Sequence, residues 1–187
     1  MESDRQLYRD LEKIFYTEAE IKAAVKELGQ RITRDFAGRE LLCVCILKGA
    51  GIFFSDLIRE IDLPLETDYM VVSSYGASTT TSGEVRIVKD LDCSAEGKEI
   101  LIIEDIVDTG TTMNYLKNYM LHRGVKSLNI VSLLDKPSRR APGIDLKVDY
   151  SCFEVPDAFV VGYGLDYAQK YRNLPDIGVL SPEVYAK

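Results

Sequence analysis

The sequence from residue 100 to residue 112 reads Ile100-Leu-Ile-Ile-Glu-Asp-Ile-Val-Asp-Thr-Gly-Thr-Thr112. Its apolar run stops at two adjacent carboxylates, Glu104 and Asp105, and a third carboxylate, Asp108, opens a short stretch of Thr and Gly. In the following residues, 113–120, apolar side chains recur at helical spacing. The stretch therefore predicts a buried strand, a tight loop and a helix start, which is where open α/β sheets bind ligands.

The residue types in the loop favour a bound phosphate. Gly110 has no Cβ, so its backbone can approach an anion closely and adopt angles closed to other residues. Thr109, Thr111 and Thr112 offer hydroxyl donors, and the first N–H groups of the following helix have no partner inside that helix. A Walker loop is excluded, because the pattern G-x-x-x-x-G-K-[ST] is absent.

The acid pair needs a different explanation, because carboxylates repel an anion. Glu104 and Asp105 could accept hydrogen bonds from the two hydroxyls of a ribose, or help to hold a divalent cation. A ligand with a phosphate at one end and a sugar diol at the other fits both halves of the stretch. The alternative is an ordinary strand-to-helix turn in which Asp108 only caps the helix. That alternative explains Asp108 and Gly110 but not the acid pair, so we favour the ligand site.

Length and composition indicate one compact domain. The chain has 187 residues, of which 46% are hydrophobic, enough for a core. A formal net charge of −7 argues against broad contact with nucleic acid. No apolar run approaches the ~20 residues that span a bilayer, and the first residues are polar and mixed in charge, unlike a signal peptide. A cytoplasmic protein with no membrane or nucleic-acid partner is expected.

The cysteines and the single histidine suggest no metal or catalytic centre. Cys43, Cys45, Cys93 and Cys152 lack zinc-type spacing, and reduced thiols are expected. The first two alternate along one strand and are predicted to be small buried apolar residues. His122 is expected at a helix C-terminus rather than in a catalytic site.

Apolar strands alternate with amphipathic helices along the chain, which predicts an α/β fold with a mainly parallel sheet flanked by helices. One helix is expected within residues 1–30, with Gly29 as its stop, and another after Gly51. The expected strands are 41–47, 68–73, 84–88, 100–103, 128–134 and 159–161.

The quoted stretch resembles the motif with which type I phosphoribosyltransferases bind PRPP (5-phosphoribosyl 1-pyrophosphate): a hydrophobic strand, two acids, then D-T-G-x-T. Other blocks narrow the resemblance to the hypoxanthine-guanine phosphoribosyltransferases, and they agree in order and spacing from about Leu41 to Pro175. They are Leu47-Lys48-Gly49, Ser73-Ser74-Tyr75-Gly76, Leu134-Asp135-Lys136-Pro137, and Phe159-Val-Val-Gly-Tyr-Gly-Leu-Asp-Tyr167 with Arg172-Asn-Leu-Pro175.

The resemblance implies a purine salvage enzyme. It would move the 5-phosphoribosyl group of PRPP to N9 of hypoxanthine or guanine, giving IMP or GMP and pyrophosphate, with Mg²⁺ as cofactor. It also implies the type I phosphoribosyltransferase fold in a single domain, with a core of about residues 36–150 and a small hood from about 1–35 and 151–187. A homodimer or homotetramer is expected.

The resemblance further implies the residues that meet PRPP. Residues 108–112 would hold the 5′-phosphate, with Asp108 as the candidate general base, and Glu104 and Asp105 would hold the ribose diol or a metal. Lys48, Gly49 and Arg172 would contact pyrophosphate, and the peptide bond before Lys48 can be cis in this family. Residues 73–83 read either as a plain hairpin connection or, by resemblance, as a flexible lid led by Ser74 and Tyr75.

The purine site is likewise implied by resemblance. Lys136 would donate to the 6-oxo group, so adenine, with an amino group there, should be a poor substrate. Phe159 would stack on the base, and the backbone of Val160 would contact the purine edge. Asp166 would serve as a further purine-edge contact and as a second Mg²⁺ site. The basic pair 139–140 is expected to be solvated surface without a role.

Two rival functions come from other classes. A pyrimidine-operon RNA-binding regulator with the same fold would need a basic face, which the net charge opposes. A non-enzymatic sensor of PRPP or nucleotides is opposed by the joint presence of the lid block, the acid pair, Asp108 and Arg172.

Overall fold

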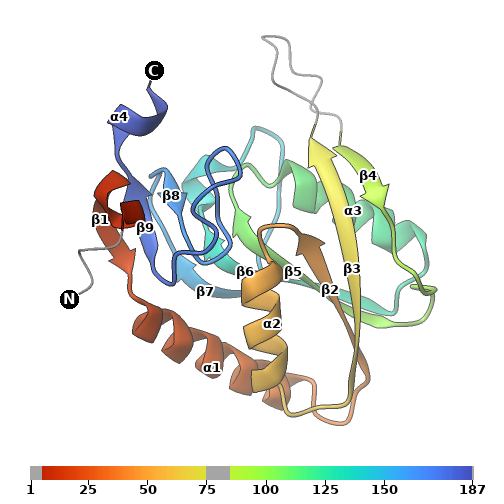
Figure 1. Cartoon of the computed structure of the whole chain (residues 1–187). Coiled ribbons are helices and arrows are strands. Elements are labelled where there is room, and N and C mark those ends of the chain that lie inside the picture. The colour runs from red at the N-terminus through yellow and green to blue at the C-terminus, as the bar shows by residue number, and fades with distance from the viewer. Residues whose placement is uncertain (1–5, 75–84, 187) are drawn as a thin grey trace.

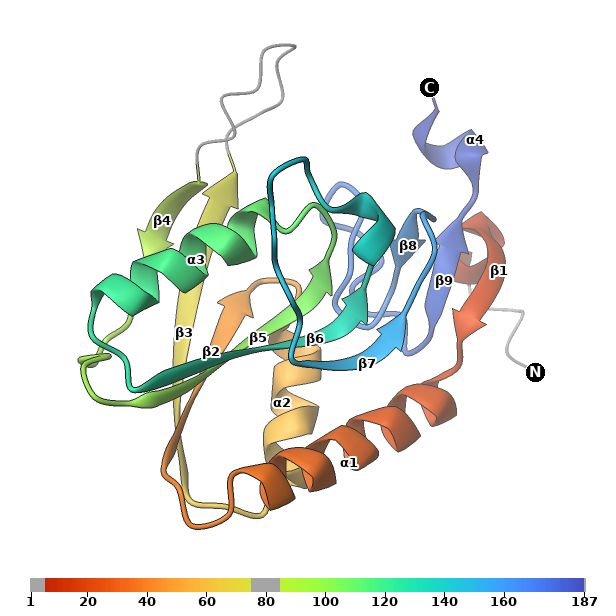
Figure 2. The same cartoon turned by 180° about the vertical axis from the view of Figure 1, so that it is seen from behind.

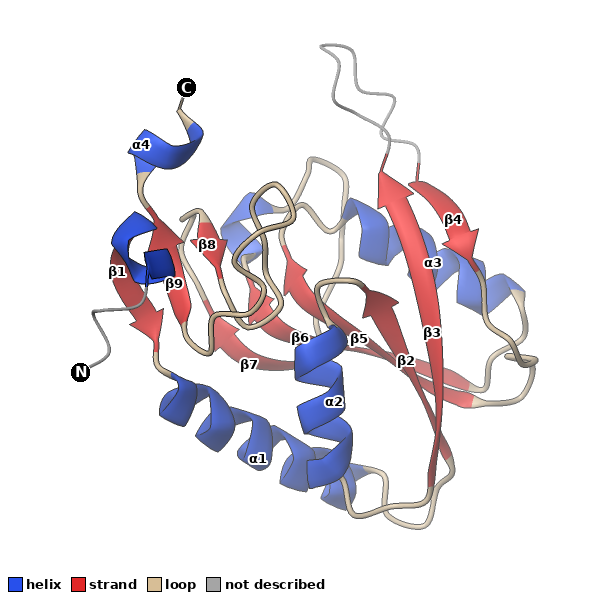
Figure 3. Ribbon diagram, in the orientation of Figure 1, coloured by secondary structure: helices blue, strands red, loops and turns tan. Residues whose placement is uncertain are grey.

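A six-stranded sheet forms the centre of the computed structural model, which describes residues 6–74 and 85–186. The strand order is β4-β3-β2-β5-β6-β7 (Figure 3). The strands of this sheet are β2 (Leu41–Leu47), β3 (Leu65–Ser74), β4 (Val85–Lys89), β5 (Glu99–Val107), β6 (Ser127–Asp135) and β7 (Tyr150–Glu154).

All strands of this sheet run parallel except β4, which returns antiparallel to β3. Leu41 at the start of β2 lies opposite Leu65 of β3 and Glu99 of β5, so these three strands begin in register. Their carboxyl ends therefore open on the same edge of the sheet. The predicted mainly parallel α/β fold is confirmed.

Helices cover both faces of the sheet (Figures 1 and 2). The helices α1 (Glu18–Asp35) and α2 (Gly51–Glu60) pack on one face, and α3 (Thr111–His122) packs on the other. Alternate side chains of β2 serve the two faces: Cys43 and Cys45 join the core under α1 and α2, whereas Val44 and Ile46 join the core under α3. A strand buried on both faces must be apolar throughout, which is why β2 reads as an unbroken apolar run.

Helix α1 extends beyond the predicted stop. Thr17 caps its start in a capping box with Glu20, but the helix passes through Gly29 and ends only at Asp35. The prediction that Gly29 ends the helix is wrong, because the apolar stripe continues to Ile32. Gly29 has a packing role instead, since a Cβ there would lie 2.5 Å from the Cβ of Glu60.

Strand β5 also runs further than predicted. It does not end before the acid pair but continues to Val107, because its backbone still pairs with β6 there: Glu104 lies opposite Ser132 and Val107 opposite Asp135. The acid pair thus stands on a paired strand rather than on a loop, which restricts the backbone that carries both carboxylates.

A second sheet, of three short antiparallel strands, was missed in large part by the sequence patterns. Its order is β1-β9-β8, and it joins the two ends of the chain. It lies near the carboxyl edge of the main sheet (Figure 1). Its strands are β1 (Leu11–Tyr16), β9 (Ile177–Leu180) and β8 (Val160–Val161), flanked by the 3₁₀-helix η1 (Gln6–Asp10) and the short helix α4 (Pro182–Tyr185).

Two sequence predictions lie partly beyond the described structure. Ser74 is the last residue of β3, and Tyr75 lies outside the described residues, so the lid stays a prediction. The division into a core (36–150) and a hood (1–35 and 151–187) also stays a prediction.

The thiols and the histidine lie as expected. All four cysteines are unpaired, and burial raises the pKa of the Cys43 thiol to about 12. His122 is the last residue of α3, with its Nδ1 2.6 Å from the carbonyl oxygen of Asn118. Within residues 6–74 and 85–186, no helix combines the length and apolar character that crossing a membrane requires.

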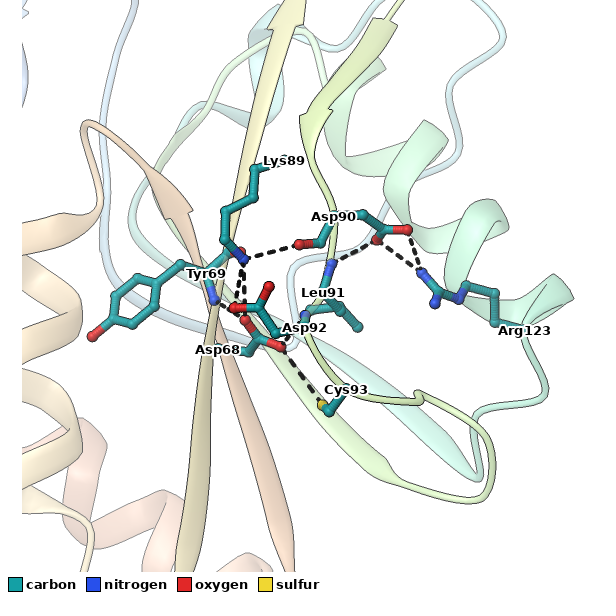
Figure 4. Close-up of polar contacts among 8 residues, drawn as sticks. All are labelled: Asp68, Tyr69, Lys89, Asp90, Leu91, Asp92, Cys93 and Arg123. Atoms are coloured by element: carbon teal, nitrogen blue, oxygen red, sulfur yellow. Dashed lines mark hydrogen bonds and ion pairs between the residues drawn. The ribbon is translucent and has the colours of Figure 1, made fainter.

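A polar cluster ties the β3–β4 hairpin to the connection that leads into β5 (Figure 4). The buried carboxylate of Asp68 accepts hydrogen bonds from the backbone N–H groups of Tyr69 (2.7 Å) and Asp92 (2.8 Å), and Lys89 Nζ lies 3.5 Å away. Next to it, Asp90 pairs at 2.8 Å with Arg123, the residue that follows α3. Burial raises the pKa of Asp68, but the hydrogen bonds and Lys89 outweigh it and leave the pKa below its ordinary value.

We expect Asp68→Asn to lower the free energy of unfolding by about 1–3 kcal/mol at pH 7, because buried backbone donors lose a charged acceptor. Since the folded pKa of Asp68 is depressed, its contribution is fully present above its ordinary pKa of ~3.9 and disappears as the pH falls further. Urea denaturation between pH 3 and pH 7 should therefore show a difference that shrinks in acid. Asp92→Asn, which removes an exposed partner of Lys89, is the matched control and should cost less than ~1 kcal/mol. Equal losses in the two variants would contradict the assignment.

Candidate active site

Two adjoining hollows open at the carboxyl edge of the parallel strands. The larger has a volume of about 850 Å³ and the smaller about 430 Å³. Both are lined by Asp105, Ile106, Asp108 and Asp166, so the end of β5 forms a common wall. The larger hollow is also lined by Lys136, Phe159 and Val160, and the smaller one by Gly49, Glu104, Thr109, Gly110, Thr112 and Arg172.

The predicted site residues are thus largely brought together from distant parts of the chain. Of the predicted residues outside the lid, Lys48 and Thr111 line neither hollow. Both lie next to residues that line the smaller hollow: Lys48 precedes Gly49, and Thr111, the first residue of α3, stands between Gly110 and Thr112. The structure does not test the function of any of these residues, so their roles stay predictions.

The acid pair is the most strongly perturbed titratable group of the site. Asp105 accepts a hydrogen bond from the backbone N–H of Ile106 (2.8 Å), and Glu104 accepts one from the N–H of Asp105 (3.1 Å). Burial first, and then the charge of Asp105, raise the pKa of Glu104 well above its ordinary value. Burial also raises the pKa of Asp105, although the charge of Arg172 opposes this. Two interacting carboxylates at neighbouring positions favour a shared proton or a bound cation.

Gly49 is the residue on which the acid pair packs. A Cβ at this position would overlap the carboxylate of Asp105, so only glycine allows the β2–α2 loop to lie against β5 here. The peptide bond between Leu47 and Lys48 is cis, the form that the family resemblance allows.

The loop after β5 has the geometry of an anion site. Gly110 adopts a left-handed conformation with φ 78° and directly precedes α3, and its carbonyl oxygen accepts the first helical hydrogen bond, from Asn114 (2.8 Å). Thr109 Oγ1 accepts from the Thr111 N–H at 3.4 Å. Backbone N–H groups of a first helical turn and threonine hydroxyls at one place suit a phosphate.

Arg172 and Asp166, both in the connection between β8 and β9, line one side of the smaller hollow. Arg172 Nη2 lies 2.6 Å from Asp166 Oδ1, and Arg172 Nη1 donates to the carbonyl oxygen of Gly164 at 2.7 Å. Arg172 Nη2 also donates to Gln169 Oε1 at 3.4 Å, so the planar fork is held by three partners on its own loop while it lines the smaller hollow.

Lys136 reaches into the larger hollow from the end of β6. Although it is only 5% exposed, its Nζ donates to the carbonyl oxygen of Ala158 at 2.6 Å and lies 3.9 Å from the carboxylate of Asp157. A buried ammonium group held by one carbonyl keeps two further protons for a ligand acceptor.

Phe159 stands in the same hollow as part of a group of three aromatic rings. It is 41% exposed, and its ring stacks on that of Tyr185 at a centroid distance of 4.9 Å and an interplanar angle of 21°. Tyr167 meets Phe159 edge-on at 5.6 Å. The Phe159 ring is thus partly covered from α4, and its exposed part lines the larger hollow, where a planar ligand could stack on it.

Arg139, Asp157 and Tyr185 are among the residues of the larger hollow to which the sequence analysis gave no role. Arg139 bridges two carboxylates, with its Nε 3.3 Å from Asp108 and its Nη1 3.3 Å from Asp157. Tyr185 lies beyond the last block that resembles the family, so no motif pointed to it. Asp157 and Arg139 each lie within a few residues of a recognised block, and that proximity was the available signal.

A third hollow, of about 510 Å³, lies at the opposite, amino edge of the strands. Most of its charged side chains are paired with one another: Arg39 and Lys126 with Glu99, and Lys98 with Glu66. The carboxyl edge, where the charged groups face a hollow shared by several loops, is the stronger site candidate.

No group of three or more His, Cys, Asp or Glu side chains is close enough to cage a metal ion among residues 6–74 and 85–186. Mg²⁺ does not need such a cage, because it keeps several waters and is commonly held by one or two carboxylates together with substrate phosphates. The donor set of Glu104 and Asp105, with Asp166 across the same hollow, fits that pattern.

A model of the phosphoribosyl transferase domain matches residues 13–168, which is most of the chain. The fold and the loop after β5 agree with that match. The chain therefore belongs to the phosphoribosyltransferase family.

Similar proteins indicate which members of this family the chain resembles most. The chain is 57% identical over 176 residues to the hypoxanthine-guanine phosphoribosyltransferase of Bacillus subtilis, covering 94% of this chain and 97% of the relative. It is 49% identical over 181 residues to the enzyme of that name from Streptococcus thermophilus, covering 97% and 99%. A crystal structure of a hypoxanthine phosphoribosyltransferase from Staphylococcus aureus superposes with a TM-score of 0.94 at 50% identity, over 100% of both chains. The resemblance to the hypoxanthine-guanine phosphoribosyltransferases is confirmed.

We expect Gly49→Ala to lower the free energy of unfolding by about 1–3 kcal/mol, because the new Cβ would overlap the Asp105 carboxylate. Gly51→Ala is the matched control two residues away, since its Cβ would meet only Leu47 Cδ2 at 3.7 Å, an ordinary contact. Chemical denaturation of both variants measures the difference. A Gly49→Ala protein as stable as Gly51→Ala would contradict the close approach.

Proposed function

We propose that this protein is a purine salvage enzyme that transfers the 5-phosphoribosyl group of PRPP to N9 of hypoxanthine or guanine. The products are IMP or GMP and pyrophosphate. The observation that carries the proposal is the shared wall of the two hollows: Asp108 lines both, with the threonine loop on one side and Lys136 with Phe159 on the other. That wall would place a sugar phosphate and a planar base on either side of one carboxylate.

The loop 108–112 binds the 5′-phosphate in this proposal and so fixes the sugar relative to the base. Glu104 and Asp105 accept hydrogen bonds from the ribose hydroxyls, directly or through a metal and its waters. Their raised pKa values fit this role, because partly buried carboxylates gain from donors or a cation. Lys48, Gly49 and Arg172 meet the pyrophosphate end.

The base lies in the larger hollow. Lys136 donates to the 6-oxo group, Phe159 stacks on the ring, and the backbone of Val160 with Asp166 meets the purine edge. Stacking on one aromatic ring contributes about 1–3 kcal/mol per base. An amino group at position 6 would oppose the Lys136 donor with another donor, which disfavours adenine.

Asp108 is the proposed general base for the purine proton. It stands where the two hollows meet, and Arg139 Nε lies 3.3 Å from its Oδ1. Hydrogen bonding and electrostatic stabilisation of positive charge on the sugar form a large part of its proposed role.

Mg²⁺ is the proposed cofactor, held by Glu104 and Asp105 and, at a second position, by Asp166. When bound, it supplies positive charge that neutralises the departing pyrophosphate. Arg172 pairs with Asp166 and so adds a protein cation at the same end of the site.

A cytoplasmic location and a homodimer or homotetramer are part of the proposal and rest on the family resemblance. The rival sensor or RNA regulator has no support from the relatives, whose names are those of enzymes.

Pyrophosphate release from PRPP and Mg²⁺ tests the function, with hypoxanthine, guanine, xanthine, adenine and uracil supplied in parallel. We expect turnover with hypoxanthine and guanine and little with adenine, because only the 6-oxo group accepts from Lys136. Turnover with adenine or uracil would contradict the purine site. Folded protein that binds PRPP but turns over none of the bases would favour the sensor.

We expect Asp108→Asn to lower kcat by about 100-fold while the KM for PRPP stays near that of the unchanged protein, because the proton acceptor is lost but the phosphate loop is kept. Steady-state kinetics with hypoxanthine measures both constants. Asp145→Asn, which removes an exposed carboxylate on the following loop, is the charge-matched control. Equal loss of kcat and of PRPP binding in Asp108→Asn would contradict the base assignment.

A further inference from the structure

Two adjacent arginines have opposite environments in the structure. The side chain of Arg139 is 47% exposed, as a surface residue would be. That of Arg140 is only 14% exposed and forms an ion pair with Asp135, the last residue of β6, which is equally buried. The expectation that both are solvated surface is therefore wrong for Arg140. A guanidinium this far out of water needs partners for its charge and its donors.

The guanidinium of Arg140 donates hydrogen bonds to backbone carbonyl oxygens from two separate parts of the chain. Its Nη1 donates to the carbonyl oxygens of Val107 (2.9 Å) and Asp108 (2.6 Å), which lie at the end of β5 and the start of the threonine loop. The same nitrogen lies 3.2 Å from the carbonyl oxygen of Lys136. Its Nη2 meets the Asp135 carboxylate. One side chain thus joins the backbone of the phosphate loop to that of the residue proposed to meet the purine.

The surrounding backbone reinforces this junction. The N–H of Lys136 donates to the carbonyl oxygen of Val107 at 2.9 Å, and the N–H of Ala141 donates to that of Thr109 at 3.0 Å. The Arg140 stem lies along the loop, since a Cβ on Gly110 would stand 3.1 Å from Arg140 Cδ. Each carbonyl that Arg140 binds belongs to a residue at or next to a proposed ligand contact.

We propose that Arg140 is a positioning residue that holds the phosphate loop and the purine loop in a fixed relation, without touching substrate itself. The inference rests on the proposed function and adds to it a physical link between the two half-sites. The reaction needs the anomeric carbon and N9 in near contact, and a misplacement of about 1 Å can cost about 100-fold in rate.

Lysine cannot replace arginine in this role. The planar fork presents several donors in fixed directions, so it reaches three carbonyls and a carboxylate at once, whereas an ammonium group is a single point at the end of a flexible stem. Charge-assisted hydrogen bonds from a buried guanidinium are also stronger than neutral ones. Arg140→Lys therefore keeps the charge beside Asp135 but loses the geometry.

The test compares Arg140→Ala and Arg140→Lys with Arg123→Ala. Arg123 is a suitable control because it also pairs with an aspartate, Asp90, and is partly buried, but it lies just beyond the C-terminal end of α3 (Figure 4). We expect kcat/KM to fall about 100-fold in Arg140→Ala and about 10-fold in Arg140→Lys. Circular dichroism should show that both variants remain folded. Arg123→Ala should keep kcat/KM while its melting temperature falls.

Rescue separates positioning from general stabilisation. Adding millimolar guanidinium or methylguanidinium to Arg140→Ala should restore part of kcat in a saturable way, because the small cation can occupy the space of the missing side chain. Methylammonium at the same concentration and ionic strength should not restore it. Guanidinium should leave Arg123→Ala and the unchanged protein unaffected.

Three outcomes overturn the inference in an enzyme whose unchanged form is active. They are full activity in folded Arg140→Ala, equal rescue by methylammonium and guanidinium, and, if Arg140→Ala does not fold, full activity in Arg140→Lys. Absence of phosphoribosyl transfer in the unchanged protein with any base would instead overturn the proposed function, so the two failures are distinguishable.

Discussion

The pairing of β5 between β2 and β6 is the constraint on which the rest of the site depends. Because both neighbours run parallel to it and helices cover both faces, β5 is buried along most of its length and its carboxyl end is its first opening to solvent. Apart from Glu99 at its first position, which pairs with Arg39 and Lys126, the charged residues of β5 lie at that end. The strand holds Glu104 and Asp105 in a paired backbone, then releases the chain at Val107 into the threonine loop. The position of the acids and of the anion loop is thus set by one strand end.

Opposite charges are arranged around that strand end in a protein that is acidic as a whole. The chain has 30 acidic and 23 basic residues, so an anionic ligand must be met by local positive charge. Arg172, Lys136 and the amino end of α3 lie around the hollows, while the acid pair lies between them. Burial raises the pKa values of the acid pair, which makes that pair receptive to donors or to a cation rather than to phosphate. The arrangement separates the side proposed to bind the anion from the side proposed to bind the diol or a metal.

The two arginines after Lys136 show how neighbouring residues of one type acquire different roles. In sequence they form an ordinary basic pair in a polar turn. In the fold, Arg139 bridges Asp108 and Asp157 at the mouth of the larger hollow, and Arg140 turns inward to the carbonyls of the loop after β5. The difference depends on where the end of β6 lies relative to the end of β5, a relation between residues about 30 positions apart. Neither helical nor strand periodicity carries that information.

By itself, the sequence determined the α/β class, the parallel strands 41–47 and 128–134, the tight loop around Gly110, and the family. It did so because buried strands must be apolar, a left-handed turn favours glycine, and the motifs recur in order. Only the tertiary structure decided the length of β5, the passage of α1 through Gly29, the sheet formed by the two chain ends, and the stacking of Tyr185 on Phe159. These features depend on contacts between distant segments: backbone pairing that extends a strand past charged residues, and packing that tolerates glycine inside a helix. Such contacts override the local conformational propensities of the residues, so only the tertiary structure could reveal these features.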